Sequence, residues 1–156
     1  MKTIILTIFI SVLLVSCKTG DGLTKQETIN QMTEKIESRN YTFVPQTALP
    51  MGGRSINLSY SYALKVSNDT IDSYLPYFGR AYTAPSPMDE GGVKFVSTDF
   101  DYSISDKKKG SWDVKINVKN NQKLYNLNLQ IGDTGNATLT VSETSKQPIT
   151  FYGKIE

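Results

Sequence analysis

The chain has 156 residues, with 17 lysines and arginines against 15 aspartates and glutamates, and it contains no histidine. This length suits a single domain, and 38% hydrophobic residues can supply a core, which argues against wholesale disorder. The net charge of +2 gives no electrostatic case for binding nucleic acid. Without histidine, histidine-dependent triads and histidine–metal sites are excluded. We predict no cofactor, no metal site and no nucleic-acid partner.

The first 16 residues have the pattern of an export signal. A basic start precedes an apolar run from Ile4 to Val15, which is too short for a membrane-spanning helix but suits a signal peptide. The run ends in Leu14-Val15-Ser16-Cys17, which resembles a bacterial lipobox, where the chain is cut before a cysteine that receives lipid. We predict a lipoprotein signal peptide over residues 1–16 and lipidation of Cys17. The alternative is an incidental thiol behind an ordinary secretory signal.

A short tether and one helix are expected next. Residues 17–23 contain the lipidated cysteine, two glycines and an aspartate, so we predict a flexible link to a single domain over residues 24–156. The sequence from Thr24 to Ser38 carries apolar residues at helical spacing, and Thr24 and Glu27 are placed as in a capping box. We predict one amphipathic helix that docks across one opening or face of a sheet.

From residue 41 onward the hydrophobic period changes from that of a helix to two, which is typical of half-buried strands. The runs with this alternation are Tyr41–Val44, Ile56–Val66, Thr70–Leu75, Gly92–Ser105, Trp112–Val118, Tyr125–Ile131, Ala137–Val141 and Ile149–Ile155. Within the fourth run the apolar parity switches, and a bulge near Ser97–Asp99 would return all its apolar residues to one face. Short turn-rich links between the runs indicate antiparallel neighbours.

These runs predict a mainly β fold, an antiparallel meander of about eight strands with one N-terminal amphipathic helix. One hydrophobic face must close on itself or be covered, so the meander forms a closed or partly open barrel or a two-layer sandwich. Alternation alone leaves open an outer-membrane barrel whose apolar face meets lipid. That alternative is disfavoured, because a lipid anchor would be redundant and the aromatic residues form no clear pair of interfacial girdles.

The segment from Tyr74 to Tyr82, Tyr-Leu-Pro-Tyr-Phe-Gly-Arg-Ala-Tyr, concentrates aromatic residues beside one arginine. Two interpretations stay open. In the first, Pro76 and Gly79 turn the chain, the rings plug one barrel end, and Arg80 is paired internally. In the second, the segment is a ligand-binding rim, where rings stack on a sugar or acyl chain and the arginine forks onto a carboxylate or phosphate. The candidate rim residues are Tyr74, Tyr77, Phe78, Arg80 and Tyr82.

Four stretches of the sequence together resemble the domain-of-unknown-function family numbered 4251, found in lipoproteins of Bacteroidetes-type bacteria. They are Gly53–Leu58, Tyr74–Tyr82, Gly92–Phe95 and Lys109–Trp112. The likeness covers roughly residues 41–155, and Leu75–Tyr82 is its most specific part. Lys146-Gln147 stands where the resemblance implies Arg-Gln. The resemblance implies an envelope lipoprotein and supplies no catalytic residues.

Three weaker signals concern charged turns and carboxylates. The basic turn Asp106–Gly110 is interpreted as solvated rather than as a lipid-headgroup site. Gly132–Asn136 offers oxygen ligands but is too short for an EF-hand, so it is interpreted as a hairpin turn. Asp89-Glu90 and the pair Asp99 and Asp101 provide the minimum for glycosidase-type chemistry, without any indication that either pair shares a cleft.

Three functional hypotheses follow. The first is a non-enzymatic envelope lipoprotein that binds a small amphiphile, glycan or protein partner, and it is held to the membrane by its lipid. The second is a structural or assembly factor of the outer membrane, and the third is a carboxylate-based hydrolase. No clear acidic cluster follows Cys17, so we expect a periplasm-facing position at the bacterial outer membrane. The sequence leaves the oligomeric state open.

Overall fold

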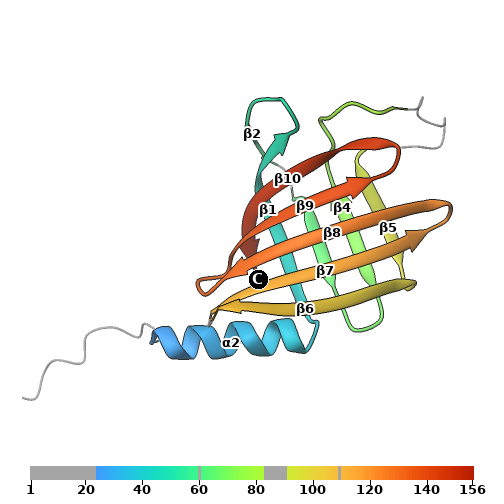
Figure 1. Ribbon diagram of the computed structural model, residues 1–156. Coiled ribbons are helices and arrows are strands. Elements are labelled where there is room, and N and C mark those ends of the chain that lie inside the picture. Colours follow the sequence, from blue (N-terminus) through green and yellow to red (C-terminus); the bar gives the residue numbers. More distant parts are fainter. Residues whose placement is uncertain (1–23, 60, 83–90, 109) are drawn as a thin grey trace, which may run out of the picture.

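The computed structural model describes residues 24–59, 61–82, 91–108 and 110–156, and these form a β-barrel with a helix at one end (Figure 1). The predicted signal peptide, Cys17 and the tether lie outside the described residues. The elements are α2 (Lys25–Glu37), β1 (Tyr41–Pro50), β2 (Ile56–Asn57), β3 (Ala63–Val66), β4 (Ile71–Leu75), β5 (Val93–Ser97), β6 (Phe100–Lys108), β7 (Ser111–Asn120), β8 (Lys123–Gly132), β9 (Asn136–Glu143) and β10 (Lys146–Ile155).

All strand pairs are antiparallel and belong to one sheet. Its order is β5-β4-β3-β1-β10-β9-β8-β7-β6, and β2 pairs with β1 off this path. The two end strands, β5 and β6, follow each other in the chain, so the sheet curls until its ends approach and forms a nearly closed barrel. The predicted mainly β fold is confirmed. Of the two architectures that alternation left open, the structure has the barrel.

The helix begins and docks as the sequence predicts. The Thr24 backbone N–H donates to Glu27 Oε2 at 2.7 Å, and the Glu27 N–H donates back to Thr24 Oγ1 at 3.3 Å, which completes a capping box. These hydrogen bonds lower the pKa of Glu27. Met32 and Ile36 are buried against the barrel. No helix among the described residues is long and apolar enough to cross a membrane.

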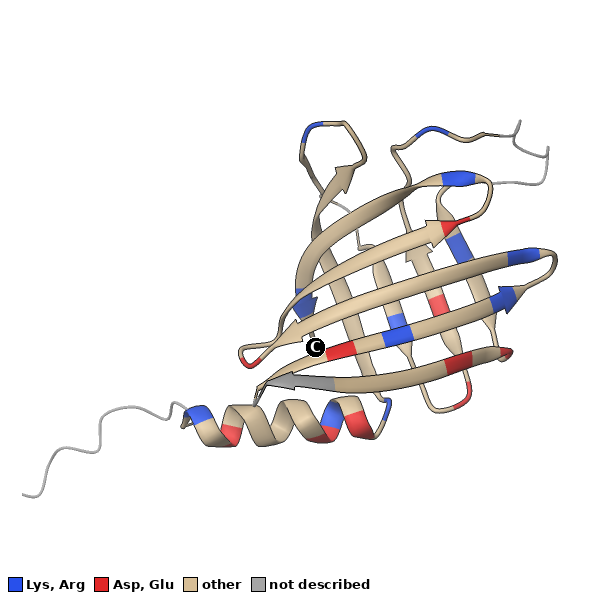
Figure 2. Ribbon diagram, viewed as in Figure 1, with Lys and Arg blue, Asp and Glu red and all other residues tan. Residues whose placement is uncertain are grey.

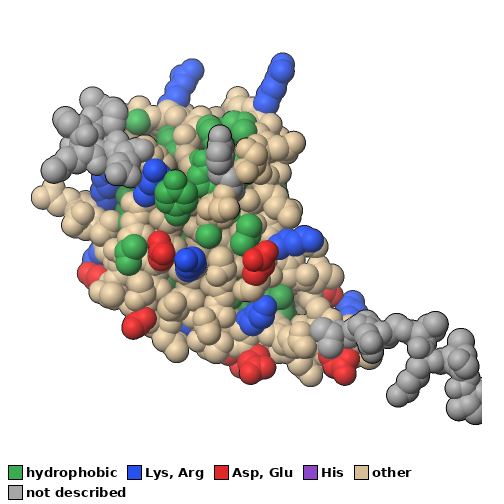
Figure 3. All heavy atoms as spheres, turned by 180° about the vertical axis from the view of Figure 1, so that it is seen from behind, with side chains coloured by type: hydrophobic (Ala, Val, Ile, Leu, Met, Phe, Trp, Pro, Cys, Tyr) green, Lys and Arg blue, Asp and Glu red, His purple; other side chains and the backbone are tan. Residues whose placement is uncertain are grey.

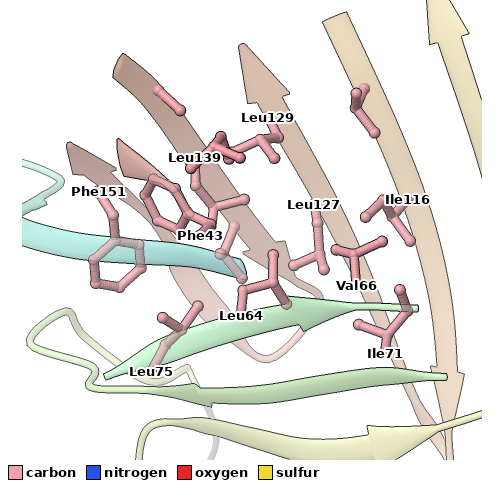
Figure 4. Close-up of a cluster of buried hydrophobic side chains, with 14 of the residues drawn as sticks. Phe43, Leu64, Val66, Ile71, Leu75, Ile116, Leu127, Leu129, Leu139 and Phe151 are labelled. Carbon is pink, nitrogen blue, oxygen red and sulfur yellow. The ribbon is translucent and has the colours of Figure 1, made fainter. Parts of the chain in front are cut away.

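Side chains fill the inside of the barrel. In Figure 4, residues from β1, β3 and β4 point toward residues from β7, β8, β9 and β10. The largest fully buried side chains include Phe43, Leu64, Leu75, Ile116, Leu127, Leu129, Leu139 and Phe151. Strand alternation explains this arrangement, since every second residue faces inward and these inward positions are the apolar ones. The fold therefore owes its stability to an interior packed with apolar side chains.

The predicted continuous strand Ile56–Val66 is wrong, because the chain forms β2 and β3 there. β2 pairs with Thr47 and Ala48 of β1, whereas β3 pairs with Tyr41 to Phe43. After Leu58, whose N–H still donates to the Gln46 carbonyl oxygen at 2.9 Å, the described residues before β3 leave the ladder. Leu58 and Tyr62 nevertheless pack against the core. The alternation continues through the break, so the apolar pattern alone could not reveal it.

The cause of this break lies in β1. Pro45 has no N–H to donate to a neighbouring strand, and the register between β1 and β10 shifts between Pro45 and Thr47. Gly153 of β10 permits this close approach, since a Cβ there would lie 2.8 Å from Pro45 Cα. The β1 edge is therefore interrupted where a continuous partner strand would have to pair.

The predicted bulge near Ser97–Asp99 is also wrong, because β5 ends and β6 begins there. Ser97 Oγ donates to the Lys119 carbonyl oxygen at 2.7 Å, and the Lys119 N–H donates to the Asp99 carbonyl oxygen at 2.9 Å. The chain thus passes from the β4 edge of the sheet to the β7 edge within a few residues. Two of the eight predicted runs are divided in this way, which accounts for the ten strands.

Candidate functional site

A groove of about 570 Å³ lies at the end of the barrel opposite α2. Three segments form it: the turn between β1 and β2, the segment after β4, and the start of β10 (Figure 1). Its lining residues are Pro50, Met51, Gly52, Gly53, Arg54, Ile56, Phe78, Gly79, Arg80 and Gln147. This volume is in the range of small-ligand clefts.

The groove exists because β1 and the segment after β4 share the edge of β10. β1 pairs with β10 as far as Pro50, which lies opposite Ile149, and then turns away. Beyond that point the segment after β4 takes over, since the Gln147 N–H donates to the Arg80 carbonyl oxygen at 3.0 Å and the Tyr82 N–H donates to the Ser145 carbonyl oxygen at 2.8 Å. The groove lies between the end of β1 and the segment after β4.

Tyr77 holds the backbone of the segment after β4 from the side facing away from the groove. Its hydroxyl donates to the carbonyl oxygens of Arg80 at 2.8 Å and Gln147 at 2.9 Å, sharing one proton between them. Gly79 leaves room for this ring, since a Cβ there would lie 2.7 Å from Tyr77 Cζ. Burial raises the pKa of Tyr77, and the hydrogen bond to Gln147 opposes that shift. The hydroxyl stays protonated at neutral pH and remains a donor.

A buried ion pair supports Tyr77 in turn. Lys146 Nζ lies 3.6 Å from Glu143 Oε2, and the two side chains are 11% and 4% exposed. The same ammonium donates to the Gly92 carbonyl oxygen at 3.1 Å and lies 5.3 Å from the centre of the Tyr77 ring. Ser145 Oγ donates to Glu143 Oε1. Lys146, which stands where the resemblance implied arginine, therefore holds the groove wall in place.

Both arginines of the groove expose their side chains. Figure 2 shows basic residues on the β1–β2 turn, on the segment after β4 and at the start of β10. Within the described part of the chain, neither the Arg54 nor the Arg80 guanidinium forms an ion pair or a hydrogen bond, and no carboxylate lines the groove. Met51 is 65% exposed and Phe78 is 44% exposed beside them. The groove thus offers two cations and, among its apolar lining residues, two with strongly exposed side chains.

The predicted rim residues do not all meet in this groove. Phe78 and Arg80 line it, and Tyr77 lies behind its wall. Tyr74 is on the outer face of β4, where its ring stacks on the Tyr62 ring with 5.7 Å between ring centres. Lys94 Nζ lies 4.9 Å from the centre of the Tyr74 ring. Tyr82 is 66% exposed and contacts Ser145 through its backbone N–H.

The interpretation that the rings of this segment plug one end of the barrel is wrong for three of them. Phe78, Tyr74 and Tyr82 remain 44%, 48% and 66% exposed, so they do not seal the barrel end. The turn at Pro76 and Gly79 is present, and Pro76 is buried. Arg80 is held through its backbone, while its guanidinium has no partner in the described residues, contrary to the internally paired arginine of that interpretation.

Sequence reasoning missed Met51, Ile56 and Gln147 as parts of the site and used Arg54 only as part of the family resemblance. A signal was present, because a methionine and an arginine flank two glycines in a turn between two predicted strands. Apolar and cationic side chains on such a turn must face solvent or a ligand. Gln147 had no comparable signal, since its place in the groove depends on long-range pairing with Arg80.

The weaker sequence signals stay apart from the groove. Residues 132–136 form the predicted hairpin turn, where the Gly135 N–H donates to the Gly132 carbonyl oxygen at 2.9 Å and Asp133 lies 3.3 Å from Lys25 Nζ. Asp89 and Glu90 lie outside the described residues, as do the side chains of the basic turn up to residue 109. In the described ranges no cluster of three or more histidine, cysteine, aspartate or glutamate side chains could hold a metal ion.

The fold and the groove define a class of protein: a small antiparallel β-barrel with a filled interior, capped by a helix at one end and bearing an open cationic groove at the other. The chain belongs to the family described as Domain of unknown function (DUF4251), whose model matches residues 24–155. The family part of the resemblance is thereby confirmed.

One solved structure similar to this chain is a DUF4251 family protein from Bacteroides eggerthii DSM 20697. The TM-score is 0.61 at 13% identity, and the match covers 82% of this chain and 86% of the other. At this identity the likeness shows the fold alone. A comparison with curated proteins finds no match.

Proposed function

We propose that the chain is a lipid-anchored protein of the cell envelope whose barrel is a non-enzymatic binding module. Its ligand belongs to the class of small amphiphiles, glycans or protein partners and binds in the groove between Arg54 and Arg80. The observation that carries this proposal is the pair of guanidinium groups, without a partner among the described residues, beside the exposed side chains of Met51 and Phe78. Burying such groups against a ligand releases water from apolar surface and gives each cation a partner.

The filled barrel restricts how the ligand binds. Phe43, Phe151 and Leu64 are fully buried in the interior, so a ligand reaches the groove and not the barrel centre. The ring of Tyr74 already stacks on Tyr62 and lies beside the Lys94 ammonium, whereas the guanidinium groups of the groove have no partner among the described residues. The proposal therefore concerns the rim of the barrel.

Native mass spectrometry tests this binding role. The full chain is purified from its own membranes in a mild detergent, beside Arg54→Gln/Arg80→Gln. We expect a copurifying mass on the unchanged chain that is lost from the double variant. Lys65→Gln/Lys154→Gln makes the same change in net charge at exposed positions outside the groove and should keep that mass. Identical spectra for all three proteins would contradict the proposal.

The membrane part of the proposal depends on Cys17. Lipid on this thiol would hold the domain through residues 17–23, with α2 nearest the tether and the groove at the opposite end of the barrel. Acyl chains anchor stably when more than one is attached. Cys17→Ala should abolish lipid incorporation and release the chain from outer-membrane fractions. Unchanged processing and fractionation of Cys17→Ala would overturn the anchor and its periplasm-facing placement.

A second candidate, a structural or assembly factor, is favoured by one observation. Val96 and Tyr74 are 63% and 48% exposed on the outer face of β5 and β4, at one end of the sheet order. Figure 3 shows hydrophobic side chains gathered over the upper part of this rear face, with charged residues among them. Val96→Asp should then abolish partner assembly while leaving the groove ligand bound. Loss of ligand with intact assembly would exclude this candidate.

A further inference from the structure

The charge of the groove selects for an anion. Arg54 and Arg80 both line it, and the described lining contains no acidic side chain that could neutralise them. Glu143, which lies behind the groove wall, is already paired with Lys146. A guanidinium presents two parallel N–H donors that match the two oxygens of a carboxylate. An acidic group is therefore the complement that this groove lacks.

An apolar group must accompany that acid. Met51 and Phe78 are 65% and 44% exposed beside the arginines, and the half-buried Ile56 also lines the groove. Methionine is unbranched and adapts to differently shaped apolar partners. It stands next to Gly52, whose φ of +73° lies in the left-handed region that favours glycine. The apolar wall can thus accept side chains of different shape.

The position of the groove disfavours a lipid of the anchoring membrane. The distance along β10 from Gln147 in the groove to Ile155 near the helix end is about 26 Å, at roughly 3.3 Å per residue. The Ile155 N–H bonds to Gly135, whose turn meets Met32 of α2. The groove therefore faces away from the end of the barrel that carries α2, and the barrel interior between the two ends is occupied by fully buried side chains.

The chemistry of the lining disfavours a glycan. Sugar hydroxyls need several side-chain amides or carboxylates as partners, but Gln147 supplies the single such side chain among the described lining residues. Its Oε1 already accepts from the Arg80 N–H at 3.4 Å. An extended peptide needs no such array, because it carries acidic and apolar side chains a few ångströms apart along one strand.

We propose that the groove binds an extended acidic peptide segment of a partner protein. An aspartate or glutamate carboxylate lies between Arg54 and Arg80, and a neighbouring apolar side chain packs on Phe78 and Met51. This inference rests on the proposed function, because it names the ligand class of the same groove. It goes further because it assigns the charge of the ligand, the closeness of its acidic and apolar side chains, and a protein as its source.

Fluorescence anisotropy of a labelled peptide tests the assignment. The probe is fluorescein-labelled Gly-Leu-Asp-Leu-Asp-Gly, the reference is the same peptide with asparagine at both acidic positions, and the receptor is the full chain in a neutral detergent. We expect the acidic peptide to bind at least about tenfold more tightly than the reference, and Arg54→Gln/Arg80→Gln to abolish that difference. Lys65→Gln/Lys154→Gln should retain it.

Two further measurements distinguish bidentate hydrogen bonding by the guanidinium groups from simple attraction between opposite charges. Arg54→Lys/Arg80→Lys keeps both cations but loses the planar donor pair, so its affinity should fall between the unchanged chain and the glutamine variant. Phe78→Ala should weaken the leucine-containing peptide but not a peptide with glycine in place of leucine. Circular dichroism of each variant verifies that the exposed substitutions leave the barrel folded.

Competition distinguishes peptide from other oxyanions. Inorganic phosphate and a short-chain phosphatidylglycerol are added to the peptide complex. We expect neither to displace the peptide at concentrations at which unlabelled acidic peptide does so. Displacement by the lipid or by phosphate at lower concentration overturns the peptide assignment but leaves the groove a binding site. If no probe shows dependence on Arg54 and Arg80, both this inference and the proposed function fail.

Discussion

The backbone of Arg80 is held by hydrogen bonds, whereas its guanidinium is exposed. One of the groups that hold this backbone is Tyr77. Its hydroxyl joins the carbonyl oxygens of Arg80 and Gln147, so it couples the segment after β4 to the start of β10. The exposed guanidinium can therefore meet a ligand without first ordering its main chain. Preorganisation of this kind reduces the entropy lost on binding.

Removing the Tyr77 hydroxyl should weaken both the fold and the groove. Tyr77→Phe leaves two carbonyl oxygens without this donor, and we expect the free energy of unfolding to fall by about 1 kcal/mol in urea titrations. Affinity for the groove ligand should fall as well. Tyr152→Phe, at a ring that is 46% exposed on β10, is the control and should change neither quantity. Equal effects of the two substitutions would contradict the role of Tyr77.

Glu143 and Lys146 form a buried ion pair in which each side chain neutralises the charge of the other. Lys146→Ala leaves the Glu143 carboxylate buried without its cation, which should lower the free energy of unfolding by about 3–5 kcal/mol. Lys146→Arg retains the charge and should lose much less. Thermal and urea unfolding measure both variants. If the alanine and arginine variants were equally stable, the ion pair would not support the groove wall.

Sequence alone located part of the site at this scale. Phe78 and Arg80 belong to a segment whose composition was conspicuous, and both line the groove. Tyr74 was placed with them because it is near in sequence, but strand alternation turns it to the outer face of β4. Gln147 could not be predicted, because it reaches Arg80 only through pairing of residues 67 positions apart.

At the scale of elements, the contact between α2 and the barrel was the most predictable part of the fold. Apolar spacing and the capping box specified the helix, and its buried residues, Met32 and Ile36, are among the apolar residues at that spacing. The strand boundaries were less predictable. A proline and a bulge in β1 divide the strand opposite them, and neither changes the alternation of apolar residues from which strands are predicted.

Truncating the helix at its buried face should destabilise the whole domain. Ile36 is fully buried between α2 and the barrel, so Ile36→Ala should lower the free energy of unfolding by about 2–5 kcal/mol. Gln31→Ala on the exposed face of the same helix should stay within about 0.5 kcal/mol of the unchanged chain. Urea titration compares them. A small effect of Ile36→Ala would mean that the helix is not part of the cooperative fold.

The same contact should make the protein sensitive to alkali. Tyr41 and Tyr102 lie with their hydroxyl oxygens 3.2 Å apart, and the Tyr102 hydroxyl donates to the Ile36 carbonyl oxygen. Burial raises the pKa of both tyrosines above the ordinary value of 10.0. A raised pKa in the folded state gives stability that is complete below the unfolded pKa and is lost as pH rises above it.

Unfolding measured in steps above pH 10 should therefore show a falling free energy that Tyr41→Phe flattens. The exposed Tyr152 provides the comparison, because Tyr152→Phe should leave the pH dependence unchanged. A pH dependence that is the same in all three proteins would show that the buried tyrosine pair does not govern alkaline stability.

The molecule as a whole has two different ends. One end carries α2, and at the other lie the β1–β2 turn, the segment after β4 and the start of β10 (Figure 1). These three segments line the groove with its two arginines and exposed apolar side chains. The sequence predicted the mainly β fold and the capping helix, because hydrophobic periodicity is local. It could not choose the barrel over the sandwich, because that depends on how the β5 and β6 edges approach each other across Ser97–Asp99.

The central claim is that this molecule binds its ligand at the groove end of a filled barrel. The most direct measurement is photocrosslinking in intact cells with benzoylphenylalanine in place of Phe78, compared with the same replacement at Leu124, which is 53% exposed on β8. We predict a discrete adduct at position 78 that is absent at position 124 and is lost when Arg54 and Arg80 are both changed to glutamine. No adduct at position 78, or equal adducts at both positions, would contradict the account.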